Sequence, residues 1–219
     1  MTAAVRIGFL GGTLDPIHLG HIESARAAQR ALSLDRVDIV PSRIPPHRHQ
    51  QPCASPFHRF AMAALAINGS DGLAVNDLEL AAPGPSYTAD TLMRLHATGL
   101  APSQIFFIAG ADAFAEIETW ARYPDVLGLA QFIVIARPGH PVAALPARLP
   151  SLAGRMMVPP IAANAARDAA IFLVDARTPD VSSTEIRRRI AGHEPLTGLV
   201  PPAVEAHIVQ HRLYGSTGM

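Results

Sequence analysis

The chain has 219 residues, of which 49% are hydrophobic and 16% charged, and this composition excludes an intrinsically disordered protein. The 18 Lys and Arg residues balance 18 Asp and Glu residues, so the formal net charge is zero. Bulk electrostatic attraction to nucleic acid or to a membrane surface is therefore not expected, and the length is most simply that of one domain, residues 1–219.

Short apolar runs rich in β-branched and aromatic residues alternate along the chain with helical patterns. The predicted strands are 5–9, 37–40, 104–109, 131–136 and 170–174, and the predicted helices are 18–32, 56–66, 88–96 and 111–120. The strand runs are mostly continuously apolar, as expected for strands covered on both faces. This alternation predicts an α/β fold, a doubly wound parallel sheet whose ligands bind beyond the carboxyl ends of the strands.

Three longer loops interrupt this alternation. Residues 41–56 are rich in proline and histidine, residues 81–91 end in residues typical of a helix start, and residues 137–154 are rich in proline and alanine. We find no internal repeat and no linker that would divide the chain into separate domains.

The first predicted strand runs into the sequence "GGTLDPIHLGH", which predicts a phosphate-binding site. Gly11, Gly12 and Thr13 would let backbone N–H groups approach phosphate oxygens near a helix N-terminus. The pattern is neither a P-loop nor the Gly-x-Gly-x-x-Gly fingerprint of dinucleotide-binding proteins. His18 and His21, three residues apart, are expected to share a helix face and to donate hydrogen bonds to charge that develops during transfer.

A second motif, "VSSTEIRRRI", lies near the C-terminus. Together with the first, it resembles the nucleotidyltransferase superfamily that carries the His-x-Gly-His and Ser-Ser-Thr-x-Ile-Arg motifs. Leu14 departs from this pattern, since relatives commonly carry phenylalanine there, and this should affect packing more than chemistry.

Within that superfamily, the chain most resembles the bacterial nicotinate mononucleotide adenylyltransferases. The supporting segments are "IPPHR", "PSYTADTL", "IAGADAF", "TW" and "RPG". The resemblance implies a Rossmann-like nucleotidyltransferase fold and a role in NAD biosynthesis. The implied reaction transfers AMP from ATP to nicotinate mononucleotide, with Mg²⁺ bound mainly through the ATP phosphates. Such a reaction needs positioning and charge stabilisation rather than a covalent intermediate.

The resemblance also implies roles for individual residues. His18, His21 and Arg187 would be catalytic, with His21 acting on the transition state. The ATP site would comprise Gly11, Gly12, Thr13, His18, His21, Gly110, Asp112, Arg137, Ser182, Ser183 and Arg187, with Gly110 and Asp112 at the ribose and the backbone around Arg137 at the adenine. The mononucleotide site would comprise His47 and Arg48 at the phosphate, Thr88 at the pyridine carboxylate, and Trp120 stacked on the ring.

Simpler interpretations exist for several of these residues. The two glycines fit a tight turn, and Ser182 with Glu185 fits a capping box, which is compatible with phosphate binding. Trp120 also fits a core position, and Asp112 also fits a helix cap.

Histidine and cysteine also cluster at His47, His49, Cys53 and His58. Because this spacing matches no common structural-zinc pattern, we predict no metal site there.

The sequence is also compatible with other functions. The acceptor could be nicotinamide mononucleotide or phosphopantetheine, or the chain could be a non-catalytic nucleotide sensor or a histidine-rich metal-binding protein. A lone cysteine and the absence of a clear signal peptide or an apolar segment of membrane-spanning length lead us to expect a cytoplasmic protein without nucleic-acid or membrane partners. The sequence does not define an oligomeric state.

Overall fold

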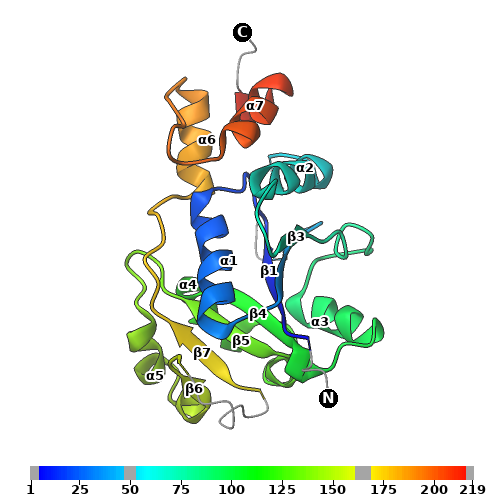
Figure 1. Ribbon diagram of the computed structural model, residues 1–219, viewed down its shortest axis with the longest axis vertical. Coiled ribbons are helices and arrows are strands. Elements are labelled where there is room, and N and C mark those ends of the chain that lie inside the picture. Colours follow the sequence, from blue (N-terminus) through cyan, green and yellow to red (C-terminus); the bar gives the residue numbers. More distant parts are fainter. Residues whose placement is uncertain (1–4, 47–52, 161–168, 216–219) are drawn as a thin grey trace.

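A single parallel sheet organises the fold. The computed structural model describes residues 5–46, 53–160 and 169–215. Its seven strands lie in the order β3-β2-β1-β4-β5-β7-β6, and each neighbouring pair is parallel (Figure 1). The strands are β1 (Ile7–Gly12), β2 (Arg36–Pro41), β3 (Leu73–Val75), β4 (Ile105–Gly110), β5 (Gln131–Ile135), β6 (Met156–Met157) and β7 (Ile171–Val174).

All five predicted strands are present, so the predicted doubly wound α/β class is confirmed. The two that the sequence did not indicate, β3 and β6, are the outermost strands of the sheet. They contain only three and two residues, which is too short for an apolar run to be distinguished from loop sequence.

Seven α-helices accompany the sheet in the described residues. They are α1 (Leu19–Leu32), α2 (Pro56–Ile67), α3 (Thr88–Ala97), α4 (Ala111–Phe114), α5 (Leu145–Arg148), α6 (Ser183–Ala191) and α7 (Pro202–Gln210). Three of the four predicted helices agree with α1, α2 and α3 to within one residue at each end. None of the described helices combines the length and the apolar character that crossing a bilayer requires.

The strands bury side chains on both faces, which explains their continuous apolar sequences. Phe9 and Phe107 contribute to a core that includes residues of α3 and α4. Leu10 and Ile108 contribute to a second core, which includes the alanine-rich face of α1. Successive strand residues point to opposite faces of a sheet, so an unbroken apolar strand supplies both cores.

A third apolar cluster lies at one end of the molecule, where α2, α6 and α7 gather near the start of α1 (Figure 1). Met62 of α2, Ile186 of α6 and Val204 of α7 are fully buried in this cluster. Ile17, from the segment between β1 and α1, is also fully buried there. The C-terminal helices are thereby packed against the chain segment that follows β1.

The predicted helix 111–120 is wrong beyond its first turn. The α-helix α4 ends at Phe114, and a 3₁₀-helix (Ile117–Thr119) follows. Phe114 and Ile117 are fully buried, and Trp120 packs against the same core. Side chains three residues apart align in a 3₁₀-helix, with three residues per turn, whereas in an α-helix they would diverge around the axis. The tighter turn therefore keeps all three on one side.

The predicted loop 137–154 is also partly wrong, because it contains α5 between two 3₁₀-helices, Val142–Ala144 and Pro150–Arg155. Its buried residues are Val142, Leu145, Leu149 and Leu152. Their spacing of three and four residues is a helical periodicity. Proline is tolerated in the first turn of a helix, so the proline content did not exclude helical structure.

Candidate active site

The predicted phosphate cradle begins at the end of β1 rather than in a loop. Gly11 and Gly12 are the last residues of this strand and are paired with Val40 and Pro41 of β2. The loop proper runs from Thr13 to His18, and α1 begins at the next residue. The backbone of the cradle is therefore held by the sheet, close to the N-terminus of α1.

A fully buried carboxylate, Asp15, holds the loop that follows β1. It accepts hydrogen bonds from the backbone N–H groups of Cys53 at 2.8 Å and Ala54 at 3.1 Å, and from the Tyr214 hydroxyl at 2.7 Å. Burial and the adjacent carboxylate raise the pKa of Tyr214, so its hydroxyl remains a donor. The Arg187 guanidinium lies 3.9 Å from the same carboxylate. Asp15 thus connects segments from four parts of the chain.

The second sequence motif contacts the same loop. Arg187 donates to the backbone carbonyl of Asp15 at 2.6 Å, and the Ser183 hydroxyl donates to the Pro16 carbonyl at 2.9 Å. Ser182 is the N-cap of α6 and accepts from the backbone N–H of Glu185, so the predicted N-cap is confirmed. The Glu185 carboxylate pairs with Arg188 and Arg189 instead of completing a capping box. The structure therefore brings both motifs together around the β1–α1 loop.

His18 and His21 are adjacent, but not as two residues of one helix. His18 is the N-cap of α1, with extended φ and ψ of −145° and 172°, and His21 lies in the first turn. The ring centroids are 3.7 Å apart. A β-carbon at Gly20 would lie 3.0 Å from His18 Nδ1 and 3.3 Å from the Pro179 carbonyl, so there is little room for a side chain at this position between the histidines.

The two imidazoles differ in exposure and in hydrogen bonding. His18 is 2% exposed, and its Nδ1 has no hydrogen-bond partner, whereas His21 lines the cavity described below. The backbone N–H of His18 donates to His21 Nδ1 at 3.3 Å. When neutral, His21 must then carry its proton on Nε2. His21 therefore retains one N–H donor, and the backbone bond defines which nitrogen carries it.

Both histidines are held in the neutral form. Burial, followed by the charge of Arg137, lowers the pKa of His18 to about 3. Burial, His18 and Arg137 together lower the pKa of His21 well below 6.5. At neutral pH each ring therefore offers one N–H group, and neither carries a charge.

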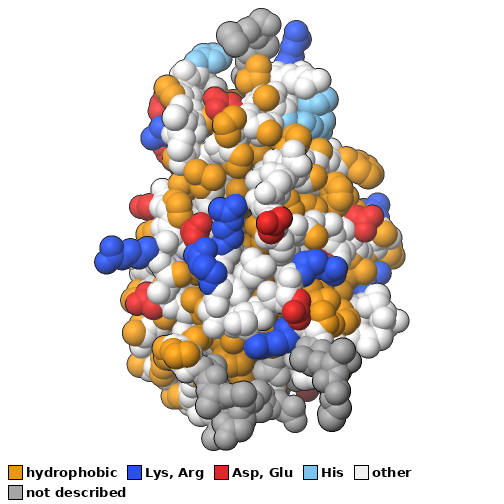
Figure 2. Space-filling view, in the orientation of Figure 1, with side chains coloured by type: hydrophobic (Ala, Val, Ile, Leu, Met, Phe, Trp, Pro, Cys, Tyr) orange, Lys and Arg blue, Asp and Glu red, His pale blue; other side chains and the backbone are white. Residues whose placement is uncertain are grey.

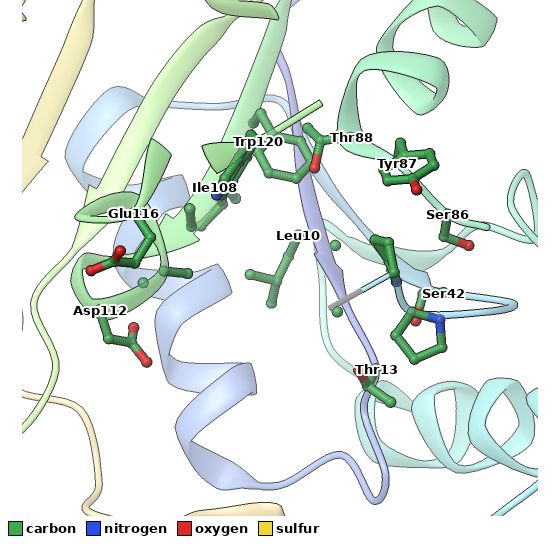
Figure 3. Close-up of a pocket in the computed structure, with 18 of the residues that line it drawn as sticks. Leu10, Thr13, Ser42, Ser86, Tyr87, Thr88, Ile108, Asp112, Glu116 and Trp120 are labelled. Atoms are coloured by element: carbon green, nitrogen blue, oxygen red, sulfur yellow. The ribbon is translucent and has the colours of Figure 1, made fainter. Parts of the chain in front are cut away.

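A cavity of about 630 Å³ opens beyond the ends of β1 and β4 (Figure 3). Of the residues predicted to bind substrates, those that line it are Gly11, Gly12, Thr13, His21, Thr88, Gly110, Asp112, Trp120 and Arg137. The cavity thus lies at the carboxyl ends of the strands, where the sequence predicts a ligand site. The described residues that line the cavity do not include His18, Ser182, Ser183 or Arg187.

Gly110, Asp112 and Arg137 form one wall of the cavity. Gly110 ends β4, and a β-carbon there would lie 2.5 Å from Asp112 Oδ1 and 2.8 Å from Arg137 Nε. A side chain at this position would displace both groups, so glycine allows them to approach the strand end. Arg137 Nε is buried without a partner, so this polar atom is available to a ligand.

Thr88 and Trp120 lie on the opposite part of the cavity from Asp112 (Figure 3). Thr88 is the first residue of α3, and the N-cap, Tyr87, makes no side-chain hydrogen bond to the helix. Trp120 meets the ring of Phe107 edge-on, with centroids 6.1 Å apart. It both packs on the core and lines the cavity. His47 and Arg48 lie outside the described residues.

Two further charged residues near the cavity were not predicted from the sequence. Glu79 lines the cavity as a buried carboxylate that accepts from the Thr91 hydroxyl at 2.7 Å, and burial raises the pKa of Glu79. Arg59 is fully buried and donates to the carbonyls of Thr13 at 2.6 Å and Arg43 at 3.1 Å. Nothing in the local sequence distinguishes them from ordinary exposed charges. Their burial follows from where α2 and the segment after β3 pack.

The lowered pKa of the buried His18 predicts that the stability of the protein depends on pH. The pKa of this residue is about 3 in the folded protein and 6.5 in a model peptide, so between these values the unfolded chain binds a proton that the native protein does not. The free energy of unfolding should therefore fall as the pH is lowered. For this group alone the loss between pH 7 and pH 5 is about 2 kcal/mol.

Urea unfolding of the wild type and of His18→Asn at several pH values measures this contribution. Asparagine is favoured at an N-cap and does not titrate. Between pH 7 and pH 5, the free energy of unfolding of the variant should therefore fall by about 2 kcal/mol less than that of the wild type. Parallel curves for the two proteins would contradict the assigned pKa shift.

Known proteins share the sequence pattern and the fold of this chain. A model of the cytidylyltransferase-like family matches residues 9–189. A relative from Roseiflexus sp., named "Probable nicotinate-nucleotide adenylyltransferase", is 40% identical over 208 residues, covering 95% of this chain and 97% of that protein. A relative of the same name from Desulfatibacillum aliphaticivorans is 36% identical and covers 96% of this chain and all of that protein.

A solved structure shares the fold. It is the Plasmodium falciparum nicotinic acid mononucleotide adenylyltransferase complexed with NaAD, with a TM-score of 0.76 at 18% identity and coverage of 97% of this chain and 98% of that one. The Rossmann-like nucleotidyltransferase fold expected from the sequence is thereby confirmed. With near-complete coverage by relatives of 36–40% identity, the chain belongs to the cytidylyltransferase-like family and, within it, to the nicotinate-nucleotide adenylyltransferases.

Proposed function

We propose that this protein transfers AMP from ATP to nicotinate mononucleotide. A phosphate oxygen of the mononucleotide attacks the α-phosphorus of ATP, and the bond from that phosphorus to the α,β-bridging oxygen breaks. The products are deamido-NAD and pyrophosphate. The attacking phosphate is already ionised near neutral pH, so the protein needs to orient two anionic substrates and stabilise the charge that develops between them.

One observation carries the proposal most directly: a neutral His21 N–H donor lies in the cavity beside the glycine-ended strand β1. The likeness in sequence to relatives named nicotinate-nucleotide adenylyltransferase identifies the reaction that this donor would serve. We assign the ATP phosphates to the Gly11–Thr13 side, with Asp112 and Arg137 near the ribose and adenine.

Arg187 and Ser183 of the second motif have a positioning role, because they hold the β1–α1 loop, while Ser182 caps α6. Arg187 still has guanidinium N–H groups beyond the one that contacts Asp15, and we retain the proposal that it also contacts the β- and γ-phosphates. His18, which is buried behind His21, would support the triphosphate site rather than line it.

Magnesium enters this proposal as part of the ATP–magnesium substrate. A bound Mg²⁺ would neutralise phosphate charge and orient the leaving group. The cavity presents Asp112 and Glu116 as carboxylates, and oxygen ligands are those that Mg²⁺ prefers. This donor set fits an ion that is held mainly by substrate phosphates.

The acid should be a better acceptor than the amide. The N-terminus of α3, which has no side-chain cap at Tyr87, presents backbone N–H groups beside Thr88, and these favour a negative charge. A charge-assisted hydrogen bond is about twice as strong as a neutral one, so we expect at least a tenfold preference, or about 1.4 kcal/mol.

A product assay with ATP, Mg²⁺ and either nicotinate or nicotinamide mononucleotide tests both the reaction and the preference. Equal kcat/KM for the two acceptors would refute the acid preference. No dinucleotide and no pyrophosphate from either acceptor would refute the proposed function.

Replacing His21 with alanine should lower kcat by about a hundred- to a thousandfold, as expected when one transition-state donor is lost. Because His21 is at the edge of the cavity, the thermal midpoint should change little. His193→Asn, at an exposed position outside the cavity, is the matched control and should keep wild-type turnover. Near-normal turnover in the His21 variant would remove this residue from the chemistry.

Trp120 should report on acceptor binding. It is the only tryptophan, so nicotinate mononucleotide should perturb all of the tryptophan emission if the pyridine ring stacks on it. Such stacking contributes about 0.5–1.5 kcal/mol beyond burial. Trp120→Ala should therefore raise the KM for the mononucleotide severalfold with little effect on ATP, and Trp120→Phe should recover part of the loss.

Separate fluorescence titrations with the two substrates decide the role of Trp120. Emission that does not change at saturating mononucleotide, together with equal effects of Trp120→Ala on both substrates, would assign Trp120 to core packing alone.

A further inference from the structure

Three histidine side chains outside the cavity meet where α2 packs against α7. His58 lies in the first turn of α2, His207 is in α7, and His211 is the C-cap of that helix. Figure 2 shows a patch of histidine side chains on the surface beside these helices. His58 and His207 are 149 residues apart in the sequence, so only the tertiary structure brings the three rings together.

The nitrogen atoms of these rings are close together. Nδ1 of His58 lies 3.1 Å from Nε2 of His207. His211 completes the group, with its ring centroid 4.3 Å from that of His207 and 4.9 Å from that of His58. One nitrogen from each ring can be chosen so that all three lie within 4.8 Å of one another.

These separations approach those of a metal site. Two imidazole nitrogens bound 2.0–2.1 Å from a tetrahedral Zn²⁺ ion lie about 3.3 Å apart, and the His58–His207 pair is already at 3.1 Å. The other separations, which reach at most 4.8 Å, would have to shorten, and His211 is exposed. Positions i and i+4 of a helix share one face, so α7 directs both of its histidines toward α2.

We propose that His58, His207 and His211 bind one divalent transition-metal ion, with Zn²⁺ as the preferred ion and water in its fourth position. Imidazole is a good ligand for first-row transition metals and a poor one for Mg²⁺. This site is separate from the cavity and does not depend on the proposed function.

The proposed site differs from the histidine and cysteine cluster noted in the sequence. His58 is common to both, but His47 and His49 lie outside the described residues, and Cys53 is not among the clustered ligands. The additional ligands come from α7, which the sequence interpretation did not predict as a helix.

A bound ion would join α7 to α2 and strengthen contacts at the active site indirectly. The chain continues from α7 to Tyr214, whose hydroxyl donates a hydrogen bond to Asp15. In the segment before α2, the backbone N–H of Ala54 donates a second hydrogen bond to the same carboxylate. Zinc should therefore stabilise the folded protein in the absence of either substrate.

Zinc binding to the full chain, with any affinity tag removed and without nucleotides, tests the proposal. Competition with a chromophoric chelator should show one Zn²⁺ per chain. At a free concentration about 100 times Kd, the thermal midpoint should rise by about 5–10 °C, whereas Mg²⁺ should produce no such rise.

Single variants identify the ligands. His58→Ala, His207→Ala and His211→Ala should each weaken zinc binding at least tenfold, while the controls His193→Asn and Cys53→Ser should keep it. Because His211 is exposed, its variant should fold normally even if the others do not. No stoichiometric zinc in the wild type, or unchanged affinity in His211→Ala, would overturn the proposal.

Discussion

The buried Asp15 carboxylate is the interaction on which the geometry of the active site depends. Placing a charge in the interior is costly unless it is paired and hydrogen-bonded, and Asp15 is satisfied by two backbone N–H groups, the Tyr214 hydroxyl and the nearby Arg187. These donors are far apart in the sequence, at residues 53–54, 187 and 214. The β1–α1 loop therefore takes its shape only when the C-terminal segment is in place, and folding of that segment is coupled to formation of the site.

The histidine pair depends on the same loop. Because His18 is enclosed at the start of α1, its pKa falls to about 3, and its backbone N–H fixes which nitrogen of His21 carries a proton. A neutral donor with a defined proton position needs no reorganisation when charge develops on a substrate, which is the basis of preorganised electrostatic catalysis. The free energy of unfolding is therefore lower at acidic pH, since the unfolded chain can protonate both rings.

Much of the fold could be predicted from the sequence because its signals are local. Continuous apolar runs such as 131–136 predict buried parallel strands, and the 3.6-residue periodicity identifies α1, α2 and α3. The two motifs, together with the shorter family-like segments, indicate the family and predict nine of the residues that line the cavity. Helix 111–120 was overestimated because residues at a spacing of three fit either helix type until the core selects the 3₁₀ form.

The order of the residues alone was enough to predict the α/β class, the family, and the strand ends where the cavity lies. The burial of individual charges could not be predicted in this way, because it depends on packing between distant segments: the partners of Asp15 are up to 199 residues away. The tertiary structure likewise placed Arg187 against the β1–α1 loop, and brought His207 to His58. Local patterns report the propensity and amphipathicity of one segment, whereas desolvation and pairing depend on which distant segments share the same space.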